Sequence, residues 1–284
     1  MNADLHAFRL GVDRGWREFR HSLGSSDQWF NVVIGIAYLT VLLFQRGSAV
    51  DGTTLSLAAL TLPSMVGMSV AFGGLVSPAG QLALNREDGT LLRAKAIPHG
   101  MVGYLVGRVV QTSLDIFLAL LIVLVPGLLV VEGLFRTGLG GVLLLVAVLV
   151  AGLLATLPWG AVVGSLAKSP QGAAGLTMLP MMGIVAISGI FYPITALPGW
   201  LQWVAQLFPV YWTGLGARSA LLPDSAAAAE IGGSWRTLET FGVLGVWAVV
   251  GLLLAPVILR RMARRESGAD MEQRRQAALT RGMG

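Results

Sequence analysis

Three polar side chains interrupt an otherwise apolar stretch of the sequence: Arg108, Gln111 and Asp115. Their spacing of three and four residues places them on one face of a helix. An acidic side chain at the centre of a membrane helix costs roughly 2.5 to 3.5 kcal/mol on insertion scales, so Asp115 needs a partner or a watery cavity. Two roles stay open for Asp115: a structural pair, with Arg108 or with another helix, and direct contact with a substrate. Arg108 could also extend its guanidinium to the membrane surface.

A second group of charged residues lies between two apolar runs, in the segment Asn85-Arg86-Glu87-Asp88-Gly89-Thr90-Leu91-Leu92-Arg93-Ala94-Lys95-Ala96-Ile97-Pro98. Leucine and isoleucine alternate there with Arg and Lys, and the segment ends at a proline. This pattern is typical of a short helix that faces a partner on the cytoplasmic side. A solvated connector explains the composition equally well.

The longest uncharged tract covers residues 169–217. It holds one apolar segment of helix length, a break at Ser188 and Gly189, and then Pro193, Pro198 and Pro209 among Leu and Trp residues. Proline ends helices and Trp favours the headgroup zone, so we expect short helices that dip into the outer leaflet. Such a segment can close a pathway from outside. The alternative is an interfacial loop without a gating role.

The sequence contains no pattern that predicts covalent chemistry. It lacks the phosphate-binding G-x-x-x-x-G-K-[ST], the zinc-binding H-E-x-x-H and the nucleophile motif G-x-S-x-G. It also has no cysteine, which excludes disulfides, thiolate metal sites and cysteine catalysis. We therefore expect no catalytic residue, no metal site and no cofactor in this chain, and no enzymatic activity of its own.

Composition places the chain among polytopic membrane proteins. Of its 284 residues 55% are hydrophobic and 12% charged, and the mean hydropathy is +0.72. The net charge of +5 does not indicate nucleic-acid binding, because the charges stand in short blocks between apolar runs. We interpret these blocks as topology signals.

Six apolar intervals between charges approach or exceed the roughly 20 residues of a membrane-spanning helix. They cover residues 28–44, 57–82, 109–131, 138–167, 172–193 and 241–259. Gly160 and Gly164 in the fourth interval would permit close helix approach, but 37 glycines make such pairs common by chance. The predicted fold is an all-α integral membrane protein with six spans and an outer re-entrant helical segment between spans five and six.

The residues before the first span predict an amphipathic helix. Apolar side chains recur there at spacings of three and four, at Leu5, Phe8, Val12, Trp16, Phe19 and Leu23. An Arg-rich opposite face favours a helix that lies in the cytoplasmic membrane interface. The alternative is a helix packed against a soluble domain. The predicted units are therefore an interfacial helix over 1–26, a transmembrane domain over 27–260 and a basic cytoplasmic tail over 261–284.

The distribution of Lys and Arg predicts the orientation, because loops kept in the cytoplasm carry the excess. With both termini inside, only Arg46, Arg136, Arg218 and Arg236 of the 20 basic residues lie in outer segments. The inner ones are Arg9, Arg14, Arg17, Arg20, Arg86, Arg93, Lys95, Arg108, Lys168, Arg260, Arg261, Arg264, Arg265, Arg274, Arg275 and Arg281. Both termini are therefore expected in the cytoplasm.

Two motifs in these positions make the chain resemble the permease subunits of type-2 ABC exporters, a family that includes daunorubicin-resistance, polysaccharide and teichoic-acid exporters. Glu87-x-Gly89-Thr90-Leu91 with Pro98 resembles the loop in which a coupling helix docks on the ATPase. Ser188-Gly189-x-Phe191-x-Pro193, with Leu197-Pro198-x-Trp200-Leu201 and Pro209, resembles the carboxy-terminal signature of the family.

The resemblance implies an ATP-driven exporter in a bacterial plasma membrane. Two copies of this chain would pair with two separate ABC ATPase subunits, which bind ATP and magnesium, and would move a hydrophobic drug, antibiotic or lipid outward. It assigns coupling to Arg86, Glu87, Asp88, Gly89, Thr90, Leu91, Arg93 and Pro98. It assigns an outer gate to Ser188, Gly189, Phe191, Pro193, Pro198, Trp200 and Pro209.

Besides a non-transporting membrane scaffold or sensor, which would need neither the coupling loop nor the outer motif, two alternatives stay open. The first is an export permease of the same family for polysaccharide or lipid-linked glycan. The second is a gradient-driven secondary transporter, which usually carries buried acidic relays or repeated halves. Asp115 is the one clearly intramembrane carboxylate of the sequence, and this argues against the second alternative.

Overall fold

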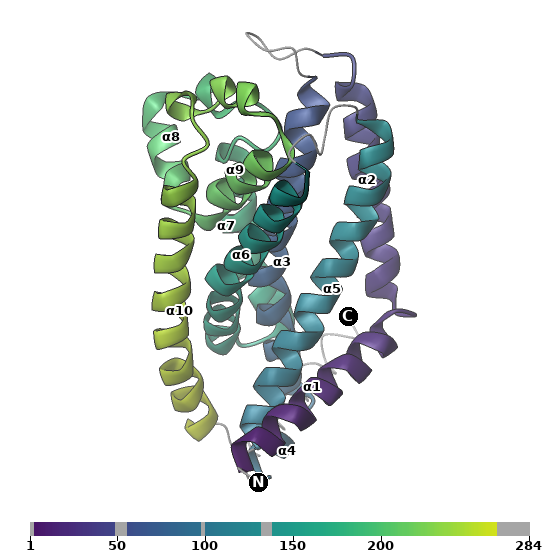
Figure 1. Cartoon of the computed structure of the whole chain (residues 1–284). Coiled ribbons are helices and arrows are strands. Elements are labelled where there is room, and N and C mark those ends of the chain that lie inside the picture. Colours follow the sequence, from purple (N-terminus) through teal and green to yellow (C-terminus); the bar gives the residue numbers. More distant parts are fainter. Residues whose placement is uncertain (1–2, 49–55, 98–99, 132–137, 266–284) are drawn as a thin grey trace.

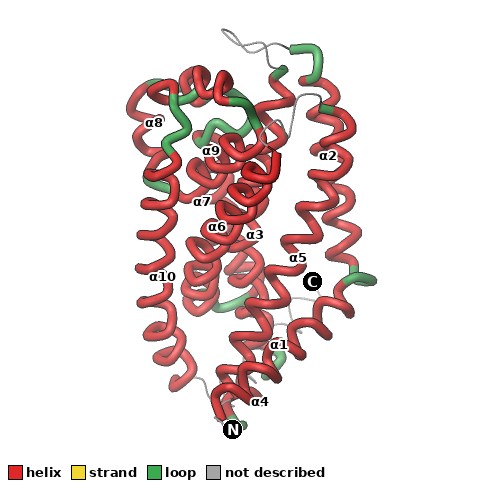
Figure 2. The backbone as a smooth tube through the Cα atoms, in the orientation of Figure 1, coloured by secondary structure: helices red, strands yellow, loops and turns green. Residues whose placement is uncertain are grey.

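The computed structural model of the chain describes residues 3–48, 56–97, 100–131 and 138–265. Over these residues the regular elements are all helices (Figure 2). The α-helices are α1 (Ala3–Ser22), α2 (Ser26–Gln45), α3 (Leu57–Glu87), α4 (Thr90–Lys95), α5 (Gly100–Val130), α6 (Gly138–Leu166), α7 (Pro170–Ile187), α8 (Gly199–Gln206), α9 (Pro209–Leu221) and α10 (Thr237–Arg265). Three short 3-10 helices join them: η1 (Ile194–Ala196), η2 (Asp224–Ala229) and η3 (Ile231–Gly233).

Five helices of the described chain are long and apolar enough to cross a membrane: α3, α5, α6, α7 and α10. The first predicted span, 28–44, falls in α2, whose apolar part Asn31–Gln45 is shorter than the other five. The all-helical membrane fold is thus confirmed. The other five predicted intervals each coincide with one of these helices.

Several helices extend beyond the apolar intervals that predicted them. α5 begins nine residues before the predicted start at 109 and includes Arg108, and α10 continues five residues into the predicted tail, to Arg265. α7 instead ends at Ile187, six residues before the predicted end at 193. Gly189 follows that end with a φ of 62°, a left-handed conformation that glycine adopts without strain. The tail beyond Arg265 lies outside the described residues.

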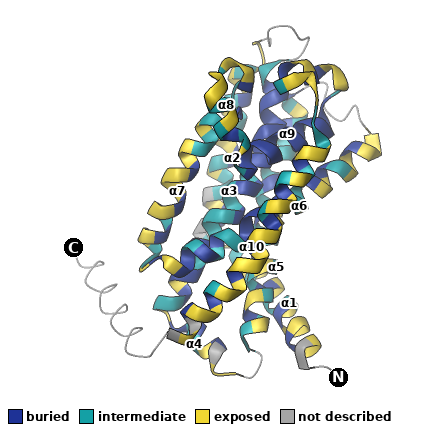
Figure 3. Ribbon diagram, turned by 90° about the vertical axis from the view of Figure 1, so that its left-hand side faces the viewer, coloured by how far each residue is buried: buried dark blue, intermediate teal, exposed yellow. Residues whose placement is uncertain are grey.

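α3 lies at the centre of the bundle and contacts α5, α6, α7 and α9. Buried residues make up 72% of its apolar window, against 17% to 28% for the other four long helices. Figure 3 shows the same contrast: α7 and α10 expose much of their surface while α9 is almost entirely buried. The position of α3 therefore determines where its neighbours can lie.

Glycines allow these neighbours to approach the backbone of α3. A Cβ atom added to Gly160 of α6 would lie 2.5 Å from the carbonyl oxygen of Leu75, and one added to Gly164 would lie 2.6 Å from that of Ala79. At Gly67 of α3 an added Cβ would overlap the backbone of Thr213 in α9. The close approach that Gly160 and Gly164 permit is thus used in the structure.

The helices define two ends of the molecule (Figure 1). One, here called the α4 end, holds α1, α4, the beginning of α5 and the end of α10. The other, the α8 end, holds α8, α9 and the beginning of α10. α3, α5, α6 and α10 run from one end toward the other.

We expect Gly164→Ala to destabilise the protein by roughly 1–3 kcal/mol, because the added methyl group meets the α3 backbone, which cannot move aside. Gly245→Ala in α10 is the matched control, since nothing lies within 4 Å of the position of its added Cβ. Thermal unfolding of the purified protein in detergent measures both. Equal melting temperatures for the two variants would contradict the close contact between α3 and α6.

Candidate functional site

The α4 segment forms because its first residues satisfy one another. Gly89 adopts a φ of 74° directly before the helix, and the Asp88 side chain accepts a hydrogen bond from the backbone N–H of Thr90 at 2.8 Å. The two apolar residues Leu91 and Ala94 are buried, with exposed fractions of 1% and 6%. They pack in a cluster with Tyr104 of α5 and Leu259 of α10. α4 contacts α5 and α3, and its apolar side faces the cluster to which α10 contributes.

The predicted coupling residues divide into an inner and an outer set. Asp88 and Arg93 are exposed, and Arg93 donates a hydrogen bond to the hydroxyl of Thr90 at 3.0 Å. Arg86 instead turns inward and donates to the carbonyl oxygens of Ser165 and Ala167 at 3.0 and 2.9 Å, at the C-terminal end of α6. A cation at this position also complements the helix dipole.

Two further predicted coupling residues are Glu87 and Pro98. Glu87 is half-buried. Pro98 lies outside the described residues. The outer surface of the segment is therefore formed by Asp88 and Arg93 together with Ala96 and Ile97, which is 62% exposed.

α1 packs against the first half of α5 through its smallest residues. Ala7, Gly11 and Gly15 follow one another at four-residue spacing and are all buried. A Cβ added to Gly11 would lie 2.8 Å from the carbonyl oxygen of Gly103, and one added to Gly15 would lie 2.5 Å from that of Gly107. Glycine pairs on both helices thus bring the two backbones together.

A row of charged and polar groups follows the same interface. Glu18 of α1 accepts a hydrogen bond from Arg14 at 2.6 Å, and its other oxygen lies 3.8 Å from the Arg108 guanidinium. Arg108 also donates to Gln111 at 2.6 Å and to Gln81 of α3 at 3.2 Å. The guanidinium of Arg108 is therefore held by α1, α3 and α5 together.

Asp115 completes this row where α1 meets α2. Its Oδ1 atom accepts hydrogen bonds from the Ser22 hydroxyl at 2.7 Å and from the Gln28 amide at 3.2 Å. The predicted polar group of Arg108, Gln111 and Asp115 thus shares one face, and that face lies against α1 and the start of α2. The sequence interpretation did not identify Glu18, Ser22 or Gln28 as partners, although Glu18 and Ser22 have helical spacing on α1.

The predicted apolar face of α1 is not covered by the rest of the chain. Leu5, Phe8 and Trp16 are each 50% exposed, and Leu23 is 49% exposed. The small-residue stripe, and not this apolar face, packs against α5. Half-exposed aromatic and leucine side chains on a helix at the α4 end leave an apolar surface available to lipid or to a protein partner.

At the α8 end, the predicted outer-gate residues surround the turn after α7. The Ser188 hydroxyl donates to the carbonyl oxygen of Ile184 at 2.6 Å and is buried. Pro198 and Pro209 stand at the starts of α8 and α9, where a missing N–H costs nothing. Trp200 of α8 is 66% exposed, whereas all of α9 is buried.

Phe191 and Pro193 occupy the turn between α7 and η1. Phe191 packs on the core cluster that contains Ile190 and Met65. Its carbonyl oxygen accepts a hydrogen bond of 3.5 Å from the Gln45 amide at the end of α2. The predicted gate residues around this turn therefore form a cap that joins the ends of α2 and α7.

A buried ion pair holds this cap, and the sequence interpretation missed it by counting Arg218 only as an outer charge. The Arg218 guanidinium lies 2.6 Å from one carboxylate oxygen of Glu230 and donates to the other at 3.2 Å. It also donates to the Ser64 hydroxyl of α3 at 2.6 Å and to the carbonyl oxygen of Gly189 at 3.4 Å. The side chains of Arg218 and Glu230 are only 2% and 5% exposed. A lone Arg at the end of the long uncharged tract was the available signal.

The arrangement connects the two ends of the molecule mechanically. Among the described residues no group of three or more His, Asp or Glu could hold a metal ion. α3 links the two ends, because Ser64 contacts Arg218 at one and Asn85 donates to the Tyr104 hydroxyl at 2.8 Å at the other. A displacement of α4 can therefore reach α9 through a single packed helix.

A family model described as ABC-2 type transporter matches residues 7–222 of the chain. The match begins inside α1 and ends directly after α9, so it includes both the α4 segment and the helices of the α8 end. No curated protein matches the chain at a significant level.

Replacing the acceptor Asp115 should loosen the junction of α1 and α2. In Asp115→Ala the Ser22 hydroxyl and the Gln28 amide lose a charged acceptor, at a local cost of roughly 1–3 kcal/mol. We expect amide hydrogen exchange over residues 5–22 to become about tenfold faster. Asp13→Ala, an exposed position on α1, is the control. Unchanged exchange in the Asp115 variant would exclude this anchoring role.

Arg218→Met should destabilise the protein by about 3–5 kcal/mol, because it leaves the Glu230 carboxylate buried without its counter-ion. Arg218→Met combined with Glu230→Met removes both charges and should recover much of that loss. Chemical or thermal unfolding in detergent gives the two values. A double variant no more stable than the single one would show that the pair is not the source of the effect.

Proposed function

Because the chain belongs to the ABC-2 type transporter family, whose model matches it over residues 7–222, we propose that it is the permease subunit of an ATP-driven exporter. Membership makes it a multi-pass membrane subunit that works with a separate ABC ATPase. The export direction, the topology, the coupling residues and the substrate class are the parts we propose here. Two copies of the chain and two ATPase subunits, which bind ATP and magnesium, make up the proposed complex.

The proposed topology has six spans, with α2 as the first, followed by α3, α5, α6, α7 and α10. The 20 residues of α2 give a helix of about 30 Å, which matches the thickness of the hydrocarbon core. An even number of spans leaves both termini on one side, and the excess of Lys and Arg at the α4 end supports the proposal that this side is the cytoplasm of a bacterial cell. α1 then lies in the cytoplasmic interface with its exposed apolar face toward lipid.

The observation that carries the proposal is the double attachment of α4. α4 contacts α3 and α5, and its buried residues Leu91 and Ala94 pack in a cluster that also contains residues of α5 and α10, while Arg93 and Ile97 face outward. A partner that moves the outer side must therefore move these helices as well. In the proposed cycle, ATP closes the ATPase dimer. ATP shifts the equilibrium toward the closed dimer because it binds that state more tightly than the open one.

The proposed exit lies beneath the cap at the α8 end. α8 and α9 form the re-entrant segment, with the exposed Trp200 in the outer headgroup zone and α9 inside the protein. The substrate we propose is a hydrophobic or amphiphilic drug, antibiotic or lipid-like molecule. The small size and high apolarity of the chain support the daunorubicin-resistance branch over the polysaccharide branch.

Charge reversal on α4 tests the coupling role. Arg93→Glu should weaken association with the cognate ATPase about tenfold and lower substrate-stimulated ATP hydrolysis, because Arg93 is exposed and its substitution leaves Leu91 and Ala94 in place. The measurement is co-purification and ATPase activity of the reconstituted complex. Arg93 suits this test better than Glu87, which is half-buried.

Arg261→Glu is the matched control, since Arg261 is exposed at the same end of the molecule but lies on α10. We expect it to bind the ATPase normally. Equal association of the Arg93 and Arg261 variants, with normal transport, would refute the assignment of α4 as the coupling segment.

A further inference from the structure

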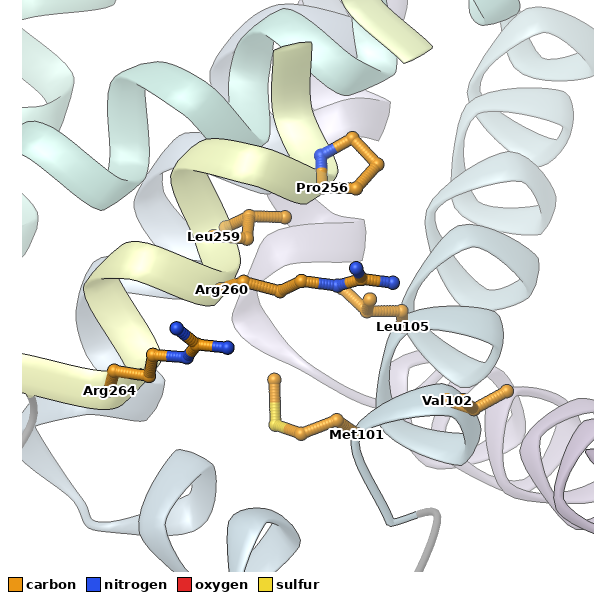
Figure 4. A pocket seen from close by; sticks show the side chains of 7 residues that line it. All are labelled: Met101, Val102, Leu105, Pro256, Leu259, Arg260 and Arg264. Carbon is orange, nitrogen blue, oxygen red and sulfur yellow. The ribbon is translucent and has the colours of Figure 1, made fainter. Parts of the chain in front are cut away.

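A pocket of about 300 Å³ lies between α5 and α10 at the α4 end, apart from both sites described above. Met101, Val102 and Leu105 line it from α5, and Pro256, Leu259, Arg260 and Arg264 line it from α10. In Figure 4 the long side chain of Arg260 extends across the pocket toward Leu105, and the Arg264 guanidinium lies below it on the same side of α10. The lining is thus apolar except for two guanidinium groups.

These two arginines differ from those that the fold uses. Arg86, Arg108 and Arg218 all donate to protein acceptors. Within the part of the chain that the structure describes, Arg260 and Arg264 have no hydrogen bond or ion pair. Their spacing of four residues nevertheless directs both into one pocket. Two adjacent cations with no counter-ion among the described residues favour an anionic ligand that approaches both.

The lining of the pocket changes along α10 from apolar to positively charged. Pro256 belongs to the last apolar turns of the span, and Arg260 and Arg264 follow it one and two turns later. α5 and α10 converge toward this end and lie farther apart toward the α8 end (Figure 1). A ligand with an apolar chain beside Pro256 and Leu105 and an anionic group beside Arg260 and Arg264 would match this lining.

We propose that this pocket binds an anionic phospholipid of the cytoplasmic leaflet, with its phosphate group between Arg260 and Arg264 and an acyl chain against Leu105 and Pro256. The orientation rests on the proposed topology, whereas the contacts rest on the pocket itself. Basic pockets between membrane helices on the cytoplasmic side are sites of this chemical kind. A soluble anion would satisfy the guanidinium groups but leave the apolar part of the pocket unfilled.

The site has a consequence for the adjacent coupling segment. Leu259 lines the pocket and also packs in the cluster that contains Leu91 and Ala94 of α4, and Met101 packs against that cluster. A bound lipid therefore contacts α5 and α10 directly beside the residues that attach α4. It would thereby link the ends of these two helices.

Native mass spectrometry of the purified full-length chain tests the proposal, with dioleoyl phosphatidylglycerol and dioleoyl phosphatidylcholine as probes. We expect the wild-type chain to retain phosphatidylglycerol preferentially. Arg260→Gln combined with Arg264→Gln should weaken its tightest binding at least about tenfold. Arg261→Gln, which removes the neighbouring charge outside the pocket, should change it less than twofold.

Two further arms make the result decisive. Leu105→Glu keeps both arginines but places a carboxylate against them, and it should weaken phosphatidylglycerol binding to a similar extent even if the double Gln variant does not fold. Inorganic phosphate at millimolar concentration should not displace the lipid. Wild-type affinity in either pocket variant, equal retention of both lipids, or displacement by inorganic phosphate would each overturn the assignment.

Discussion

The structure depends on the close approach of α6 and α9 to the backbone of α3. Lipid tails are as apolar as leucine, so helices in a bilayer gain little from hiding apolar side chains from one another, and close packing must supply the attraction. Gly67, Gly160 and Gly164 provide it, because each faces backbone atoms of a neighbour at distances that leave no room for a methyl group. This constraint makes α3, α6 and α9 a single unit. It also keeps Ser64 of α3 beside α9, where the Ser64 hydroxyl accepts a hydrogen bond from Arg218.

The polar row between α1 and α5 also depends on close packing of helix backbones. Once glycines bring these two backbones together, Glu18, Arg108 and Asp115 are close enough for their charges to be satisfied within the interface. Arg108 is only 17% exposed, and it shares its donors among an anion and two amide oxygens. The helix before the first proposed span is therefore part of the bundle and not a separate attachment. Its apolar face stays free because its small-residue face makes the contact.

Part of this architecture could be predicted from the sequence. The apolar intervals between charges located α3, α5, α6, α7 and α10, and proline and glycine marked the turn after α7. The partners of α1 could not be predicted, because Gly11 and Gly15 are indistinguishable in sequence from the other glycines. Charge counting likewise assigned Arg218 to an outer segment, since the Ser64 hydroxyl that binds it lies 154 residues earlier in the chain. Such long-range pairs leave no local pattern.

The distribution of tight and loose contacts indicates which parts can move. Thr213 of α9 lies against Gly67 and Gly152, so α9 cannot slide along α3 or α6 without a steric clash. α7 makes few such contacts, and only 17% of its apolar window is buried. A pocket lies between α5 and α10 at the α4 end. α4 contacts α3 and α5, so a force applied at α4 would act directly on the helix that packs against α6 and α9. In the proposed cycle, opening at the outer side would therefore be a movement of α3, α6 and α9 together against α7, with the Arg218 ion pair intact.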